Sequence, residues 1–117
     1  MAGLSTHILD TAKGGPAAGV RVELFEIVGE KRSLVCDAVT NDDGRTDTPL
    51  LNTDQMRPGT FEILFHIGEY FTTAASEENK TGFLNVVPVR FTITDAAQHY
   101  HVPLLASPWS YTTYRGS

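Results

Sequence analysis

Hydrophobic and polar residues alternate along several short stretches of this chain, and a period of two residues predicts β-strands rather than helices. In the first stretch, residues 4–9, Leu4 and Ile8 fall on one face and His7 falls on the other. The clearest alternation covers residues 60–67, where every second position is a large apolar residue. Further strands are predicted over residues 20–28, 34–40, 86–94, 99–105 and 110–115.

Turn-forming residues separate these strands, and Asn41-Asp42-Asp43-Gly44 is the strongest of the turn signals. Asparagine and aspartate side chains bond back to their own backbone, and glycine adopts positive φ at little cost. Arg45 follows at once, so we expect it to be held beside a rigid turn. Residues 46–57 are expected to form a loop with one short strand. Further turns are expected at residues 13–16, 29–31 and 58–59.

One segment, residues 68–79, departs from the alternating pattern. Its apolar residues have the spacing of one short helix: Tyr70, Phe71, Ala74 and Ala75. Seven or eight short strands with a single helix predict an all-β fold, a two-sheet antiparallel β-sandwich. The chain contains no internal repeat or linker, so we expect one domain over residues 1–117.

Composition narrows the range of functions. The 117 residues carry a formal net charge of −5, which argues against a nucleic-acid-binding surface. No apolar run is long enough to cross a bilayer, and the first ten residues lack the basic and apolar regions of a signal peptide. Cys36 is the only cysteine, so no internal disulfide is possible, and it is expected to be a small core residue. We therefore expect a cytoplasmic protein with no membrane partner.

Candidate chemistry gathers near the end of the chain. His99 and His101 are two residues apart, so they share one face of a strand while Tyr100 faces the core. Such a pair can bind a metal ion, but no third ligand has convincing spacing, so no metal site is predicted. The pattern alone leaves two alternatives open, a pair of solvent-exposed histidines or part of a site. It also favours a structural role for His7 and a surface position for His66.

Four segments together resemble a known family: residues 4–10 (LSTHILD), 41–45 (NDDGR), 99–105 (HYHVPLL) and 114–117 (YRGS). They are similar to segments of the 5-hydroxyisourate hydrolases, the transthyretin-related enzymes of urate breakdown. The resemblance covers nearly the whole chain. The YRGS segment is its most specific part, because its distance from the HYHVPLL motif and its place at the end of the sequence both fit the family.

The resemblance implies a transthyretin-like sandwich of eight strands with one short helix. It also implies a homotetramer, arranged as a dimer of dimers with active sites at the dimer–dimer interface. The expected substrate is a purine-derived small molecule, and no cofactor is expected. The family's catalytic residues correspond to His7, Arg45, His101 and Ser117. Substrate binding is expected to involve His7, Arg45, Tyr114, Arg115 and Gly116.

The implied reaction is the hydrolysis of a cyclic amide, which needs a base for water, stabilisation of an oxyanion and an acid for the leaving nitrogen. His7 and His101 would share the two proton-transfer roles, with His101 preferred for activating water. Arg45 would bind an oxyanion or the edge of a purine-derived ring. Ser117 would position water or a histidine through its hydroxyl or terminal carboxylate. Two alternatives stay open: a non-catalytic module that binds a small ligand, and a structural sandwich without a pocket.

Overall fold

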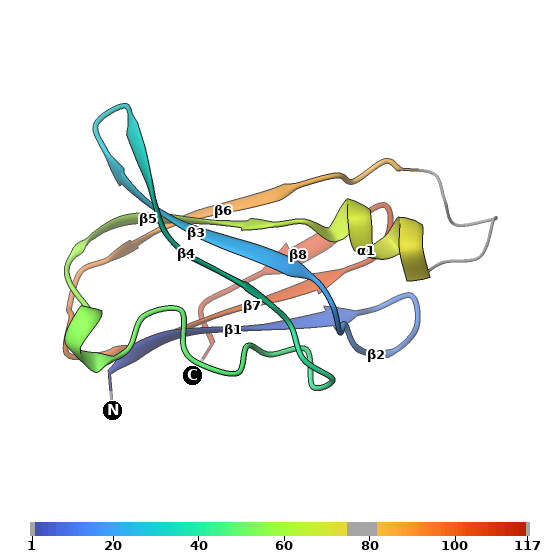
Figure 1. Cartoon of the computed structure of the whole chain (residues 1–117), viewed down its shortest axis with the longest axis horizontal. Coiled ribbons are helices and arrows are strands. Elements are labelled where there is room, and N and C mark those ends of the chain that lie inside the picture. Colours follow the sequence, from blue (N-terminus) through green and yellow to red (C-terminus); the bar gives the residue numbers. More distant parts are fainter. Residues whose placement is uncertain (1, 75–81, 117) are drawn as a thin grey trace.

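The computed structural model describes residues 2–74 and 82–116, and it contains two four-stranded β-sheets that form two layers (Figure 1). One sheet has the strand order β2-β1-β7-β8 and the other has the order β4-β3-β5-β6. The strands are β1 (Gly3–Asp10), β2 (Gly15–Pro16), β3 (Arg21–Val28), β4 (Lys31–Val39), β5 (Gly59–Phe65), β6 (Val87–Ile93), β7 (His99–Ala106) and β8 (Tyr111–Thr113). Two helical elements accompany them, α1 (Ile67–Ala74) and the 3-10 turn η1 (Thr53–Gln55).

The core lies between the inner faces of the two sheets and follows the predicted alternation. On β1, Leu4, Thr6 and Ile8 are buried, and the Thr6 hydroxyl donates to the carbonyl of Val102 on β7. The other strands contribute buried side chains that include Val22, Leu24, Phe61, Ile63, Phe65, Leu104 and Ile93. Burial stabilises the fold by about 1.5–3 kcal/mol for each large apolar side chain, before the entropy cost of ordering it. The alternation therefore decides which faces of the strands meet.

The predicted all-β sandwich is confirmed, and one strand pairing adds a feature that the sequence pattern did not indicate. β1 and β7 run parallel along their whole lengths, whereas the other pairings between described strands are antiparallel. Parallel neighbours need a long connection, and the second sheet lies within it. Periodicity identifies the residues that share a face of a strand, but it does not give the direction of the neighbouring strand.

Residues 46–57 form a loop, and the short strand that the sequence predicted there is absent. Their regular element is η1, where Asn52 and Gln55 each accept a hydrogen bond from the other's backbone amide. This reciprocal capping box favours a helical turn over a strand. The loop covers the edge of β1, because the Leu4 amide donates to the Leu51 carbonyl at 2.9 Å and the Leu50 amide donates to the Leu4 carbonyl at 2.8 Å.

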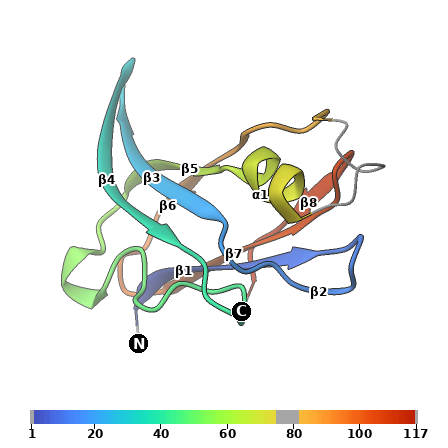
Figure 2. The ribbon, with the colours of Figure 1, turned by 45° about the vertical axis from the view of Figure 1, so that its right-hand side comes forward.

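The helix α1 begins at Ile67, one residue before the predicted segment. Tyr70 and Phe71 are buried as their spacing requires, whereas Ala75 and the rest of that segment lie outside the described residues. The Tyr70 hydroxyl donates to the buried Asp10 carboxylate at 2.7 Å, which ties α1 to the end of β1 at one end of the sandwich (Figure 2). Across residues 2–74 and 82–116, no helix has the length and apolar character needed to cross a membrane.

The prediction that His66 lies at the surface is wrong. Its side chain is only 11% exposed, and its Nε2 lies 2.6 Å from a carboxylate oxygen of Glu23. The Arg21 guanidinium lies 3.2 Å from the other ring nitrogen. Alternation correctly assigns His66 to the outer face of its sheet, but it does not show that long neighbouring side chains cover that face.

Candidate active site

Two adjacent parallel strands bring the candidate residues of β1 and β7 to one face of the first sheet. In the β1–β7 register, Ser5 lies opposite His101 and His7 lies opposite Pro103. Because Leu4, Thr6 and Ile8 face the core, Ser5 and His7 face outward. His99 and His101 also face outward, so the outer face carries three imidazoles.

A single hydroxyl connects two of these imidazoles. The Ser5 Oγ lies 2.8 Å from His101 Nδ1 and 3.0 Å from His99 Nε2. His101 is half-buried, whereas His99 is exposed. The predicted sharing of one face by the two histidines is therefore confirmed, and Ser5, which the sequence reasoning did not select, joins them. Ser5 and His7 are two residues apart in the LSTHILD segment, so alternation places them on the same face, and this is the sequence signal that identifies Ser5.

Arg45 comes to this face from the predicted turn at residues 41–44. The Asn41 side chain accepts hydrogen bonds from the amides of Asp43 and Arg45, and Gly44 has a positive φ of 74°. The Gly44 carbonyl accepts from the Ile8 amide at 2.8 Å, which fastens the turn to β1. A Cβ atom on Gly44 would overlap the Ile8 carbonyl oxygen, so both the φ angle and the close approach require glycine.

The environment of His101 favours its neutral form. Burial is the main cause that lowers the pKa of His101 from its ordinary value, and electrostatic interactions with Arg45, His7 and His99 lower the pKa further. An imidazole that stays neutral near pH 7 has a free lone pair on one ring nitrogen. It can therefore accept a proton from a water molecule.

The C-terminal tail lies directly over His101. The Gly116 amide donates to the His101 carbonyl at 2.7 Å, and a Cβ atom on Gly116 would come within 2.7 Å of His101 Cδ2. Only glycine, which has no Cβ, allows the tail to pass this close to the imidazole. Ser117, the remaining residue of the tail, lies outside the described residues.

Tyr114 and Arg115 lie along a different part of the structure from the histidines. Both residues line a pocket of about 290 Å³ beside β6, β7 and β8. The Arg115 guanidinium donates to the Gln98 side chain and to the His99 carbonyl, and it stacks 4.1 Å above the centre of the Tyr100 ring. These contacts fasten the tail to the start of β7.

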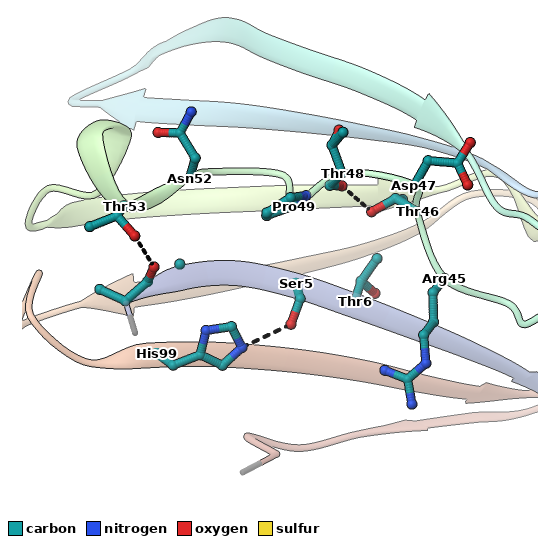
Figure 3. A pocket seen from close by; sticks show the side chains of 12 residues that line it. Ser5, Thr6, Arg45, Thr46, Asp47, Thr48, Pro49, Asn52, Thr53 and His99 are labelled. Carbon is teal, nitrogen blue, oxygen red and sulfur yellow. Dashed lines mark hydrogen bonds between the residues drawn. The ribbon is translucent and has the colours of Figure 1, made fainter.

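A second pocket opens beside the histidines, between β1 and the loop that covers its edge. It has a volume of about 420 Å³, and its lining includes Ser5, Arg45 and His99. Figure 3 shows the Ser5–His99 hydrogen bond on one side of this pocket and Arg45 extending from its loop past β1. The loop contributes polar groups from residues 46–48, 52 and 53. A mostly apolar pocket with one cation, one imidazole and a few hydroxyl and amide groups suits a small ligand that carries polar atoms.

The geometry gives this face the parts of an acid–base hydrolytic site. His101 offers a neutral imidazole that can act as a base, His7 adds another imidazole side chain, and Arg45 offers a cation with several donors. Within the part of the chain that the structure describes, no three histidine, cysteine or carboxylate side chains are grouped as a metal site would require.

Nearly the whole chain is similar to known proteins. The model of a family described as the HIUase/Transthyretin family matches residues 4–116. The 5-hydroxyisourate hydrolase of Deinococcus radiodurans is 53% identical over 115 residues, and the match covers 98% of this chain and 96% of that protein.

Two solved structures extend the likeness to three dimensions. A 5-hydroxyisourate hydrolase of Klebsiella pneumoniae superposes with a TM-score of 0.79 at 33% identity, with 100% of both chains covered. An (S)-allantoin synthase superposes with a TM-score of 0.87 at 42% identity and covers 99% of this chain. The present chain spans only 44% of that synthase, so the likeness concerns one part of a longer protein.

Proposed function

The chain belongs to the HIUase/Transthyretin family, and we infer that it is an enzyme that hydrolyses 5-hydroxyisourate. The observation that carries this inference is the 53% identity to a 5-hydroxyisourate hydrolase over nearly the full length of both chains. The grouping of His7, Arg45 and His101 on one face supplies chemistry that suits the reaction. A purine-derived substrate and a role in urate degradation follow from the same activity.

The reaction consumes one water molecule and opens one ring. Water adds to a ring carbonyl of 5-hydroxyisourate to give a tetrahedral oxyanion, and the carbon–nitrogen bond of the cyclic amide then breaks. The ring nitrogen receives a proton, and the carbonyl carbon becomes a carboxylic acid. The product is 2-oxo-4-hydroxy-4-carboxy-5-ureidoimidazoline.

We propose that His101 is the base that removes a proton from the attacking water. Its lowered pKa supports this role, because a larger fraction of the imidazole is neutral and able to accept a proton at physiological pH. His7 then protonates the leaving nitrogen. Arg45 stabilises the oxyanion, since a guanidinium donates several hydrogen bonds and keeps its charge throughout the reaction.

The tail completes the proposed site. We propose that Ser117 orients the attacking water, which the close approach of Gly116 to His101 supports. Tyr114, Arg115 and Gly116 are proposed to bind substrate, although the contacts of Arg115 with Gln98 and His99 favour a role in holding the tail. We further propose a homotetramer in the cytoplasm, with each site completed at an interface between dimers.

The decay of ultraviolet absorbance of 5-hydroxyisourate, generated in the cuvette from urate by a urate oxidase, tests this function. Wild-type protein should accelerate the decay above the uncatalysed rate. His101→Asn should lower kcat by about 10²–10⁴-fold, because it removes a general base, while thermal unfolding stays close to wild type. His66→Asn is the matched control, because His66 follows β5 of the other sheet, and this variant should retain activity. Wild-type protein that is folded but gives no acceleration would reject the enzymatic function and favour ligand binding without turnover.

A further inference from the structure

The Ser5 hydroxyl occupies a position that no proposed catalytic role explains. Its oxygen lies 2.8 Å from His101 Nδ1 and 3.0 Å from His99 Nε2, so it bridges two imidazoles from alternate positions of β7. The strand register fixes this arrangement, because Ser5 is the direct partner of His101 across the parallel β1–β7 pair. Two paired strands therefore hold the three side chains together.

The number of hydrogen atoms in this bridge limits the directions that its two hydrogen bonds can take. A serine hydroxyl has one hydrogen, so it can donate to only one of the two ring nitrogens. Whichever imidazole does not receive that hydrogen must present its own N–H to Ser5, since two facing lone pairs repel each other. A neutral imidazole carries only one N–H, so the direction of the Ser5 hydroxyl decides which nitrogen of His101 is protonated.

We propose that Ser5 and His99 are positioning residues that hold His101 in the tautomer with the proton on Nδ1. Ser5 donates its hydrogen to His99 Nε2 and accepts the N–H of His101 Nδ1. His101 Nε2 then keeps its lone pair for the proton of the attacking water. This inference rests on the proposed function of His101 as the base, and it adds two residues and a direction to that function.

The opposite direction of the bridge would prevent the reaction. If Ser5 donated to His101 Nδ1, the single proton of neutral His101 would sit on Nε2. The only ring nitrogen free of Ser5 would then be a donor, and it could not accept a proton from water. His99 is therefore needed as an acceptor, because it gives the Ser5 hydrogen a partner other than His101.

The bridge also supports the charged form of His101 that arises during the reaction. Once His101 Nε2 has taken a proton, the Nδ1–H bond to Ser5 becomes a charge-assisted hydrogen bond, which is stronger than a neutral one. The Ser5 hydrogen continues to bond to His99, so each imidazole keeps its hydrogen bond to Ser5. When His101 returns its proton, the same tautomer is restored for the next turnover.

Nitrogen-15 NMR of the free protein tests the tautomer without any substrate. The two ring nitrogens of each neutral histidine have distinct chemical shifts and two-bond couplings, and the signals of His101 are those missing from His101→Asn. We expect wild-type His101 to be protonated on Nδ1 and Ser5→Ala to shift the population towards Nε2. Ser33→Ala, the same change on exposed strand β4, is the control and should leave His101 unchanged.

Kinetics test the consequence for turnover. Ser5→Ala and His99→Phe should each lower kcat by about tenfold to a hundredfold, as is typical when a group that orients a reactive side chain is lost. Ser5→Thr should keep a kcat close to that of wild type, because threonine retains the hydroxyl. Wild-type His101 protonated on Nε2, or unchanged kcat in Ser5→Ala, would overturn this inference. Absence of hydrolysis by wild-type protein would instead overturn the proposed function, so the two failures are distinguishable.

Discussion

Replacing Gly116 by alanine tests whether the tail must lie against the catalytic imidazole. The new Cβ would come within 2.7 Å of His101 Cδ2 and 3.4 Å of His101 Cγ. These atoms belong to the ring near its attachment, so the imidazole cannot move away without breaking its bond to Ser5. The tail must therefore shift until the closest atoms are at least 3.4 Å apart, where ordinary van der Waals contact begins.

The expected cost in stability is small, because two effects oppose each other. Loss of the 2.7 Å hydrogen bond from the Gly116 amide to the His101 carbonyl removes about 0.5–1.5 kcal/mol. Alanine also restricts the unfolded chain, which stabilises the folded state by about 0.4–1 kcal/mol. The free energy of unfolding should therefore stay within about 1 kcal/mol of wild type.

The expected loss of activity is much larger. A displacement of about 1 Å in a reacting group can cost about 10²-fold in rate. We therefore expect Gly116→Ala to lower kcat by about tenfold to a hundredfold in the 5-hydroxyisourate decay assay, with unfolding followed in parallel by urea titration. Gly15→Ala in β2 is the matched control, because its Cβ would meet only the Lys13 side chain at 3.6 Å, and it should keep wild-type activity.

Wild-type kcat in Gly116→Ala, with the same stability, would refute this reasoning. It would mean that the tail can leave His101 without consequence, and that Ser117 has no part in the reaction. A large loss of stability with unchanged specific activity would refute it in another way, because the tail would then serve the fold rather than the site.

Two further predictions concern His101 and the turn before Arg45. Because burial and neighbouring charged groups lower the pKa of His101 below its ordinary value of 6.5, the acid limb of the kcat/KM profile should have its midpoint below pH 6.5. The contribution of His101 to the free energy of unfolding should be complete above pH 6.5 and lost as the pH falls through the folded-state pKa. The reason is that the unfolded chain binds the proton more readily than the folded chain at these lower pH values. A midpoint above pH 6.5, in activity or in stability, would contradict the prediction. Gly44→Ala should destabilise the fold by about 1–3 kcal/mol and raise KM, because the residue has a φ of 74° and its Cβ would overlap the Ile8 carbonyl oxygen. Urea titration and the decay assay measure the two effects, and unchanged values of both would show that Arg45 does not depend on this turn.

The sequence was sufficient to predict the layers of the fold because burial acts residue by residue. Alternation in residues 60–67 correctly placed Phe61, Ile63 and Phe65 in the core, and the predicted turn at Asn41–Gly44 is confirmed. The parallel pairing of β1 with β7 was not predictable in this way, because it joins segments more than ninety residues apart and depends on how the layers pack. Asn52 and Gln55, three positions apart, have the spacing of a capping box, and this local signal favours the observed helical turn over the predicted short strand.

The candidate site was predictable only in part, for the same reason. Family resemblance selected His7, Arg45 and His101, whereas spacing alone favoured ordinary structural roles for isolated polar residues. Ser5 was missed because its importance comes from its partner across the sheet rather than from its neighbours in the sequence. The correct face for Ser5 was available from alternation, but its contact with His101 required the register.

The position of the site on the outer face of a sheet makes stability and catalysis separable in this protein. The side chains that hold the layers together, such as Leu4 and Leu104, alternate with the side chains proposed to react, so neighbouring positions on one strand serve different purposes. Substitution of an outward residue removes a hydrogen bond worth about 0.5–1.5 kcal/mol, whereas truncating a buried leucine to alanine costs about 2–5 kcal/mol. Outward variants should therefore lose turnover while they remain folded. Any outward substitution that instead unfolds the chain would identify a residue whose main role is to hold the loop or the tail against the sheet.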